Sequence, residues 1–144
     1  MQKKLLTALA LGATAALAVA ALAPGGVANS RKVSARLTAN VEVRAPARAG
    51  AKGGFAGIYV ENSKGVTLLW TLSFSGLSGA ATAAQIHKGA VVVPLCGPCA
   101  SGQAGSAVLS KAVISALDSG GAYVTVRTAK NAGGEIRGRV SVSR

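Results

Sequence analysis

The chain has 144 residues, with 16 Lys and Arg against 4 Asp and Glu and a formal net charge of +12. One domain fills this length, which excludes a large multidomain enzyme. Half of the residues are hydrophobic, which disfavours intrinsic disorder, although only 3% are aromatic.

The N-terminal segment has the three-part layout of a secretory signal peptide. Lys3 and Lys4 supply the positive start, an Ala- and Leu-rich apolar stretch runs over residues 5–23, and small residues follow. The stretch is also long enough to be a retained membrane anchor. Because no stop-transfer charge run flanks it, we expect cleavage, with export of the remainder.

The cleavage point sets the domain boundary. Candidate points follow Ala20, Ala23 and Ala28, and Pro24 makes the second of these unattractive. We therefore expect a helical signal peptide over residues 1–28 and one domain over residues 29–144. Cleavage removes two of the 16 basic residues and no acidic one, so the mature chain keeps a net charge of +10.

The first half of the domain is predicted to be strands. Apolar and polar residues alternate strictly from Val33 to Val43, which indicates a strand with one buried and one wet face. A basic loop over residues 44–54 separates it from a second strand over 55–61. After a turn at 62–65, a third strand over 66–74 is broken in its alternation by Leu69 and contributes Trp70 as the largest core side chain.

The second half adds shorter strands and one helix. We expect strands over residues 83–87, 91–95, 106–109, 122–128 and 135–142, and a hairpin turn at 131–134. A helix over residues 110–117 has Ser110 as its N-cap, and Gly120 or Gly121 ends it. Frequent short strands with glycine turns predict an all-β fold: an antiparallel β-sandwich or Greek-key barrel with one short helix.

Four segments of the chain resemble the CHRD domain family, named from chordin, in its secreted bacterial form. The segments are Ala35–Val43, Leu69–Gly79, Ala83–Gly89 and Ala116–Gly138, the last of which ends in Gly-Gly-Glu-Ile-Arg-Gly. Their order and spacing match over about residues 32–142. The resemblance implies an extracellular β-sandwich without an established enzymatic activity.

Two positions depart from the family pattern. The chain has Gln85-Ile86-His87 where the family often has His-Ile-His, and Arg127 where the family often has a further His. His87 is the only histidine. Because a metal site normally needs three or four protein ligands, we expect no metal and no other cofactor, with His87 as a weak candidate ligand.

Cys96-Gly97-Pro98-Cys99 matches the tetrapeptide of the thioredoxin active site. A redox role needs the first cysteine at a helix N-terminus, whereas a glycine-rich loop follows here. Export favours a disulfide between Cys96 and Cys99 that shapes the loop locally. The alternative is a metal- or redox-active exported protein that uses His87 with the two cysteines.

The strand positions of several cations suggest a basic surface. Glu135, Arg137 and Arg139 alternate along one strand, which alone is typical of an exposed ladder with little effect on stability. Arg127 on the adjacent strand can join the two arginines. The predicted binding residues, with two from the first strand, are Lys32, Arg36, Arg127, Arg137 and Arg139.

Such a surface favours an anionic partner, although part of the charge could be dispersed solubilising charge. Candidate partners are acidic cell-wall polymers, phospholipid headgroups and polysaccharide. Nucleic acid is disfavoured because Tyr59 and Tyr123 are the only tyrosines available for stacking. With one histidine and few carboxylates, no catalytic arrangement is evident. We therefore predict an exported, non-enzymatic binding or structural module.

Overall fold

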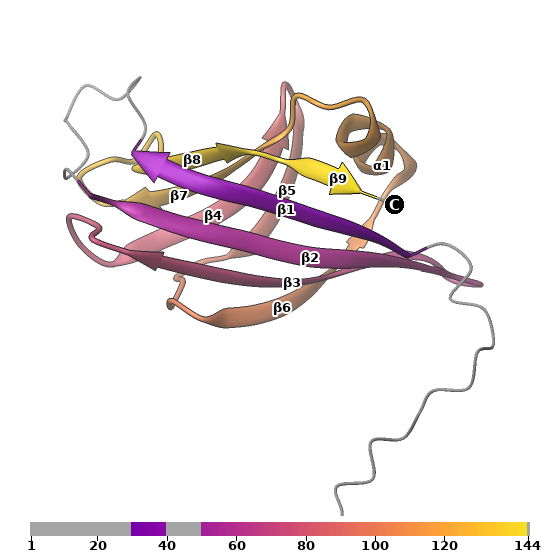
Figure 1. Cartoon of the computed structure of the whole chain (residues 1–144), viewed down its shortest axis with the longest axis horizontal. Coiled ribbons are helices and arrows are strands. Elements are labelled where there is room, and N and C mark those ends of the chain that lie inside the picture. The colour runs from indigo at the N-terminus through magenta and orange to yellow at the C-terminus, as the bar shows by residue number, and fades with distance from the viewer. Residues whose placement is uncertain (1–29, 40–49, 144) are drawn as a thin grey trace, which may run out of the picture.

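The computed structural model describes residues 30–39 and 50–143 (Figure 1). They form nine strands and one helix in the order β1 (Ser30–Ala39), β2 (Lys52–Asn62), β3 (Gly65–Ser75), β4 (Ala81–Lys88), β5 (Val91–Cys96), β6 (Gln103–Leu109), α1 (Lys111–Asp118), β7 (Tyr123–Thr128), β8 (Ile136–Arg139) and β9 (Ser141–Ser143). The predicted signal peptide, and the end of the first predicted strand at residues 40–43, lie outside the described residues.

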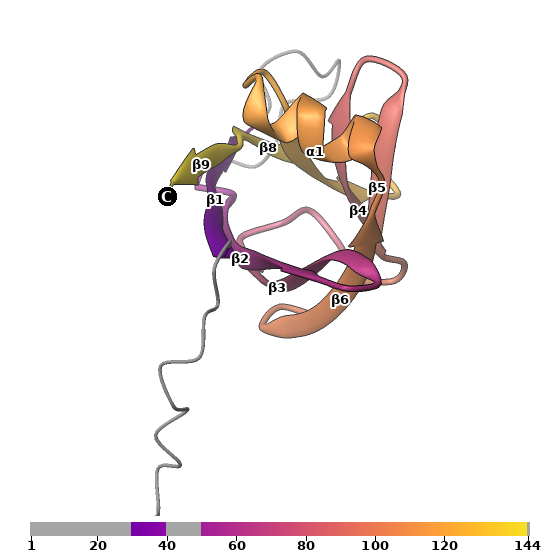
Figure 2. The ribbon, with the colours of Figure 1, turned by 90° about the vertical axis from the view of Figure 1, so that its right-hand side faces the viewer.

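The strands form one antiparallel sheet in the order β5-β4-β7-β8-β1-β2-β3-β6, with β9 paired to β1. Viewed along the strands, the sheet curls into a nearly closed barrel, which confirms the predicted all-β class (Figure 2). Along β1 the buried residues are Val33, Ala35 and Leu37, and the residues between them are exposed. Alternate side chains therefore line the core and the outer face, as a strand with one wet side requires.

Trp70 lies in the core with only 4% of its surface exposed, as its sequence pattern predicts. Its indole ring covers Gly105 on the neighbouring strand, where a Cβ atom would overlap the ring. Leu69, the residue that breaks the alternation of β3, is 49% exposed. The structure therefore confirms both the predicted alternation along this strand and its break at Leu69.

Helix α1 lies across one end of the barrel, near β5 and β9 (Figure 2). Ser110 caps its N-terminus, where the Ser110 hydroxyl accepts a hydrogen bond from the Val113 amide. The two glycines after the helix adopt the left-handed backbone, with φ of 75° at Gly120 and 82° at Gly121. No helix among the described residues is long and apolar enough to cross a membrane.

Three of the predicted boundaries were wrong because of a partner distant in sequence. Residues 52–54 belong to β2 rather than to a loop, since Gly53 pairs with β3 so closely that a Cβ would collide with the Ser73 carbonyl oxygen. Strand β6 begins at Gln103, three residues before its predicted start, because Gly105 pairs with Trp70. The last predicted strand is split at Val140, whose amide donates to the Ala122 carbonyl instead.

Candidate functional site

Strands β4, β7 and β8 place polar and charged residues side by side on the outer face of the barrel. Tyr123 of β7 lies opposite His87 on one neighbour and Arg139 on the other. One row further along, Thr125 lies opposite Arg137. Because residues two apart on a strand share a face, these five side chains lie on one side of the sheet, where Thr125 is buried with 2% of its surface exposed.

Two arginines of β8 gather over the Tyr123 ring. The guanidinium carbon of Arg137 lies 3.8 Å from the ring centroid, and that of Arg139 lies 6.0 Å from it. A cation within about 6 Å of an aromatic face is attracted by the ring quadrupole. Tyr123 therefore holds two positive charges close together on the outer face, despite their mutual repulsion.

His87 borders this pair of arginines. Its ring centroid lies 6.3 Å from that of Tyr123, and its Nε2 atom is 2.6 Å from the Thr125 hydroxyl. Burial lowers the pKa of His87 below its ordinary value of 6.5, and the positive charges of Arg137 and Arg127 lower it further. The imidazole therefore stays neutral near neutral pH.

The five predicted binding residues are only partly brought together. Arg127 lies on the same face of β7 as Tyr123, four residues away. Arg36 lies on the outer face of β1, between the Thr38–Arg137 pair with β8 and the Ser34–Ser141 pair with β9. We use the term basic face for Arg36, Arg127, Arg137, Arg139 and Tyr123.

Lys32 stands apart from the basic face. It pairs with Ser143 and with Ile58, four residues along β1 from Arg36 and six from Thr38, the partner of Arg137. These separations correspond to about 13 Å and about 20 Å of strand. The sequence placed Lys32 and Arg36 on the same side of β1, which the burial pattern bears out, but the neighbouring strands separate their surroundings.

The two sulfur atoms of Cys96 and Cys99 are 2.06 Å apart, and the pair forms a disulfide, as the sequence favoured. Cys99 also pairs with Ala81, so the loop is held against the start of β4. Cys96 pairs with Ala84, three residues or about 10 Å along β4 from His87. Among residues 30–39 and 50–143, no group of three His, Cys, Asp or Glu side chains is arranged to hold a metal ion.

Glu135 is buried, which corrects the interpretation of an exposed Glu–Arg ladder. Its side chain has no exposed surface, and it accepts hydrogen bonds from the Ser78 amide at 2.7 Å and the Ser78 hydroxyl at 3.0 Å. Burial alone would raise the pKa of this carboxyl. The bonds from Ser78, Thr128 and Asn131 outweigh burial and hold the pKa below its ordinary value.

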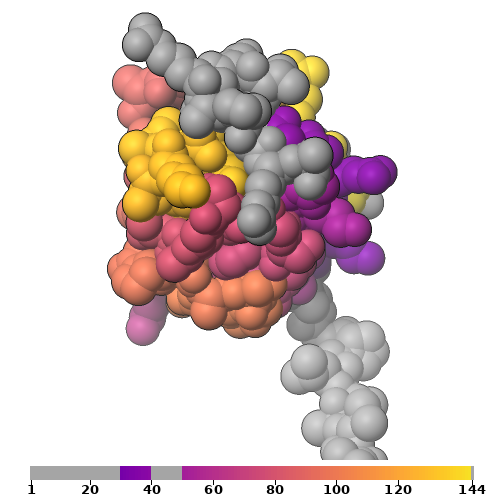
Figure 3. Space-filling view, turned by 90° about the vertical axis from the view of Figure 1, so that its left-hand side faces the viewer, coloured from indigo at the N-terminus to yellow at the C-terminus, as the bar shows by residue number. Residues whose placement is uncertain are grey.

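This buried carboxylate joins two loops at one end of the barrel. Ser78 belongs to the β3–β4 connection, and Glu135 lies in the connection between β7 and β8. Figure 3 looks onto this end and shows gold atoms of the β7–β8 turn beside rose atoms of the β3–β4 region. Glu135 therefore fixes the hairpin that carries Arg127 and Arg137 and leaves its negative charge inside the protein.

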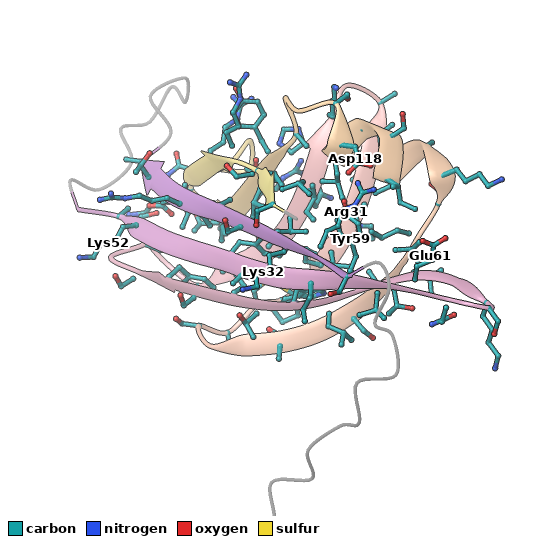
Figure 4. The ribbon with its side chains drawn as sticks, turned by 45° about the vertical axis from the view of Figure 1, so that its right-hand side comes forward. Arg31, Lys32, Lys52, Tyr59, Glu61 and Asp118 are labelled. Carbon is teal, nitrogen blue, oxygen red and sulfur yellow. A yellow bond between two sulfur atoms is a disulfide. The ribbon has the colours of Figure 1, made fainter. Side chains whose placement is uncertain are left out.

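Asp118 is a second carboxylate with hydrogen-bond partners inside the protein. The Asp118 carboxylate, at the end of α1, accepts hydrogen bonds from Arg31 at 2.5 Å and from the Tyr59 hydroxyl at 2.7 Å (Figure 4). The ion pair raises the pKa of Arg31, and burial raises the pKa of Tyr59. This cluster, which we did not predict, ties the helix to β1 and β2.

The three carboxylates of the described residues all point elsewhere or lie apart from the Tyr123 cluster. Glu135 is turned into the protein, Asp118 is paired with Arg31, and Glu61 lies near the end of β2. The role of Tyr123 was missed by the sequence argument, although counting back from the hairpin turn places it opposite Arg139.

A comparison with family models finds one match, described as the CHRD domain, over residues 33–140. No curated protein and no solved structure matches the chain. The matched range spans from the first buried residue of β1 to the residue between β8 and β9, and so covers nearly all of the barrel.

Proposed function

Because the chain belongs to the CHRD domain family, we propose that it acts as an exported binding or structural module and that it contacts its partner through the basic face. The family is in general non-catalytic, which supports a binding role over an enzymatic one. The partner that we propose is an extended anionic polymer of the cell envelope or extracellular space.

One observation carries this proposal: the Tyr123 ring, with Arg137 at 3.8 Å and Arg139 at 6.0 Å, on an outer sheet surface. A sheet of this kind displays cations in rows about 4.8 Å apart between strands and about 7 Å apart along them. Such regular spacing suits a polymer that repeats its negative charges. Guanidinium groups also bind carboxylates and phosphates through paired hydrogen bonds.

The polymer fits better than the other anionic partners. A lipid surface would favour apolar side chains beside the cations, whereas the polar Thr38 pairs with Arg137, and Gln85 lies on the strand next to Arg127. A single-stranded nucleic acid would need several aromatic rings for successive bases. The basic face has one, Tyr123.

The proposal is tested by retention of the purified protein on immobilised polyanionic cell-wall extract at rising salt, with a neutral polysaccharide matrix for comparison. We expect retention on the polyanion at low salt and its loss as salt screens the charges. The double variant R137Q/R139Q should bind about tenfold more weakly, which corresponds to about 1.4 kcal/mol.

The matched control removes the same charge elsewhere. K64Q/K111Q changes two exposed lysines in the β2–β3 turn and at the start of α1, and should keep most of the binding. If the two double variants lose equal amounts of binding, the effect depends on net charge alone, and the basic face is not the binding surface. Stronger binding to anionic lipid vesicles than to the polymer would overturn the choice of partner.

Export is the second part of the proposal, and it rests on the signal-peptide pattern of residues 1–28. The mass of the protein recovered from the culture medium or cell envelope tests it. We expect a chain that begins at Asn29. Recovery of the intact chain inside the cell would contradict the localisation and leave the basic face without its proposed partner.

A further inference from the structure

A hollow opens on the outer face beside the basic face, where β1, β2 and β3 run together. Its volume is about 330 Å³, and its lining combines Leu37, Gly53 and Phe74 with polar residues, which are Arg36, Thr38, Lys52, Ser73, Ser75 and Ser101. Figure 4 shows Lys52 where β2 begins, at the opposite end of the barrel from Tyr59 and Asp118. None of the described residues that line the hollow is acidic.

The strand register explains the shape of the hollow. Arg36, Gly54 and Ser73 form one row across the three strands, and Thr38, Lys52 and Ser75 form the next. Gly54 has no side chain, so the middle of the first row is open. A Cβ atom added there would meet only the Ser73 hydroxyl at 3.7 Å, an ordinary contact distance.

The groups around the opening are hydrogen-bond donors. Arg36 offers a fixed fork of N–H groups, and Lys52 offers a flexible ammonium. Ser73 and Ser75 add hydroxyls from the opposite wall. The Ser101 hydroxyl, also in the lining, accepts a bond from the Phe74 amide at 2.9 Å, and a hydroxyl that accepts one bond still has its own hydrogen to donate.

Donors that surround a hollow from three strands suit a ligand with acceptor oxygens on several sides. A tetrahedral oxyanion presents three or four such oxygens, whereas a carboxylate presents two in one plane. We infer that the hollow between Arg36, Lys52 and Ser73 binds a tetrahedral oxyanion, the phosphate or sulfate ester group of the anionic polymer. This inference rests on the proposed function and names the group that the polymer carries.

The hollow and the Tyr123 cluster lie on one continuous surface. Thr38 pairs with Lys52 on one side and with Arg137 on the other. Strands about 4.8 Å apart therefore connect the two positions through a single residue of β1. A polymer lying across β8, β1 and β2 places one charged group against Arg137 and another in the hollow.

Substitution of Gly54 by valine tests the hollow without a change in charge. The new side chain fills the space between Arg36 and Ser73, and a β-branched residue is well suited to a strand. The matched control is Ala56→Val, which adds two methyl groups to the same strand and the same outer face, two residues away. Ala56 lies between Ser34 and Thr71, whereas Gly54 lies between Arg36 and Ser73, which both line the hollow.

The measurement is the backbone amide chemical shift of the purified protein in a phosphate-free, low-salt buffer, titrated with inorganic phosphate, sulfate or acetate. We expect phosphate or sulfate to give saturable shifts at Gly54, Ser73 and Ser75. In G54V the affinity should fall at least about tenfold, and in A56V it should stay within about twofold. Tighter binding of phosphate than sulfate identifies a phosphate ester as the group, and the reverse identifies a sulfate ester.

Three results would overturn the inference: equal affinity for acetate, undiminished binding by G54V, and shifts spread over all surface cations without saturation. The proposed function fails separately. If G54V loses phosphate binding but is retained on the polymer like the wild type, the hollow is not a contact site for the polymer, and the proposed function stands. If the protein binds phosphate specifically but is not retained on the polymer, the polymer is not its partner, and the oxyanion site stands.

Discussion

The Arg137 guanidinium stacks on the Tyr123 ring at 3.8 Å, across the two strands of one hairpin. Tyr123 and Arg137 are diagonal neighbours, because Tyr123 pairs with Arg139 and Arg137 pairs with Thr125. Diagonal positions lie within reach of aromatic and long side chains. The ring thus holds the arginine in one orientation on the outer face, and this reduces the conformational freedom that a partner would otherwise have to remove.

The Tyr123→Leu substitution removes the aromatic face and keeps an apolar side chain. We expect polyanion affinity to fall about two- to fivefold, since an exposed cation–π contact contributes about 0.5–1 kcal/mol. Retention as a function of salt gives the measurement. The Tyr123→Phe variant is the control and should bind like the wild type, because it keeps the ring. Similar losses in both variants would argue against the stacking role.

The Glu135→Gln substitution should destabilise the barrel by roughly 2 kcal/mol, because an amide NH₂ group cannot accept the hydrogen bonds that Ser78 donates to the carboxylate. Urea unfolding followed by circular dichroism measures the loss. Glu61→Gln, at an exposed position near the end of β2, serves as the control and should change stability by less than about 0.5 kcal/mol. An unchanged midpoint for Glu135→Gln would show that the buried bonds contribute little.

The same carboxylate predicts an acid-dependent loss of stability. The pKa of Glu135 is lower in the folded protein than in the unfolded chain, where a glutamate has a pKa of about 4.3. Its contribution is therefore complete above that value and is lost as the pH falls through the lower, folded pKa. Urea midpoints measured from neutral pH down to pH 3 should fall more steeply in the wild type than in Glu135→Gln. Parallel curves would be inconsistent with the lowered pKa.

The Arg137→Gln substitution should raise the pKa of His87. The neighbouring guanidinium disfavours the imidazolium, so its removal makes protonation easier. The value should remain below 6.5, because burial, the largest cause, and Arg127 are unchanged. NMR titration of the imidazole resonances reports this single histidine directly. Lys64→Gln, in the distant β2–β3 turn, should leave the curve where it is, and a shift of equal size there would rule out a local effect.

Thiol titration of the unfolded, unreduced protein should find no free cysteine, because Cys96 and Cys99 form a disulfide. Reduction should then release two thiols. The closed loop is short, so its closure contributes little to stability, and we expect a small change in the unfolding midpoint on reduction. Two free thiols together with reductase activity towards a protein disulfide would instead favour the redox alternative.

Local patterns in the sequence were enough to predict the features that depend on neighbouring residues. Alternation placed Val33 and Leu37 inside, and a serine before a helical segment identified the Ser110 cap. Gly53 was misassigned because glycine favours loops locally, whereas here the close approach of Ser73 excludes any larger side chain. Burial of Glu135 depends on Ser78, which is 57 residues away. No local pattern reports such a contact.

In the candidate site, too, some residues could be predicted from local patterns and others depend on contacts that are distant in sequence. Arg137 and Arg139 were recognised from their alternation along one strand, and Tyr123 could have been added by counting register from the hairpin turn. Lys52 and Gly54 could not have been assigned to the site in this way, because they belong to the segment that was predicted to be a loop. The hollow exists only through the pairing of β2 with β1 and β3.

The position of β1 has a consequence for the order in which the barrel is assembled. The first strand of the sheet lies between β2 on one side and β8 and β9, the last strands, on the other. A chain that crosses a membrane with its N-terminus leading delivers β1 first and its β8 and β9 partners last. Contacts of such long sequence separation form slowly. The barrel therefore cannot close until the last strands are available to pair with β1.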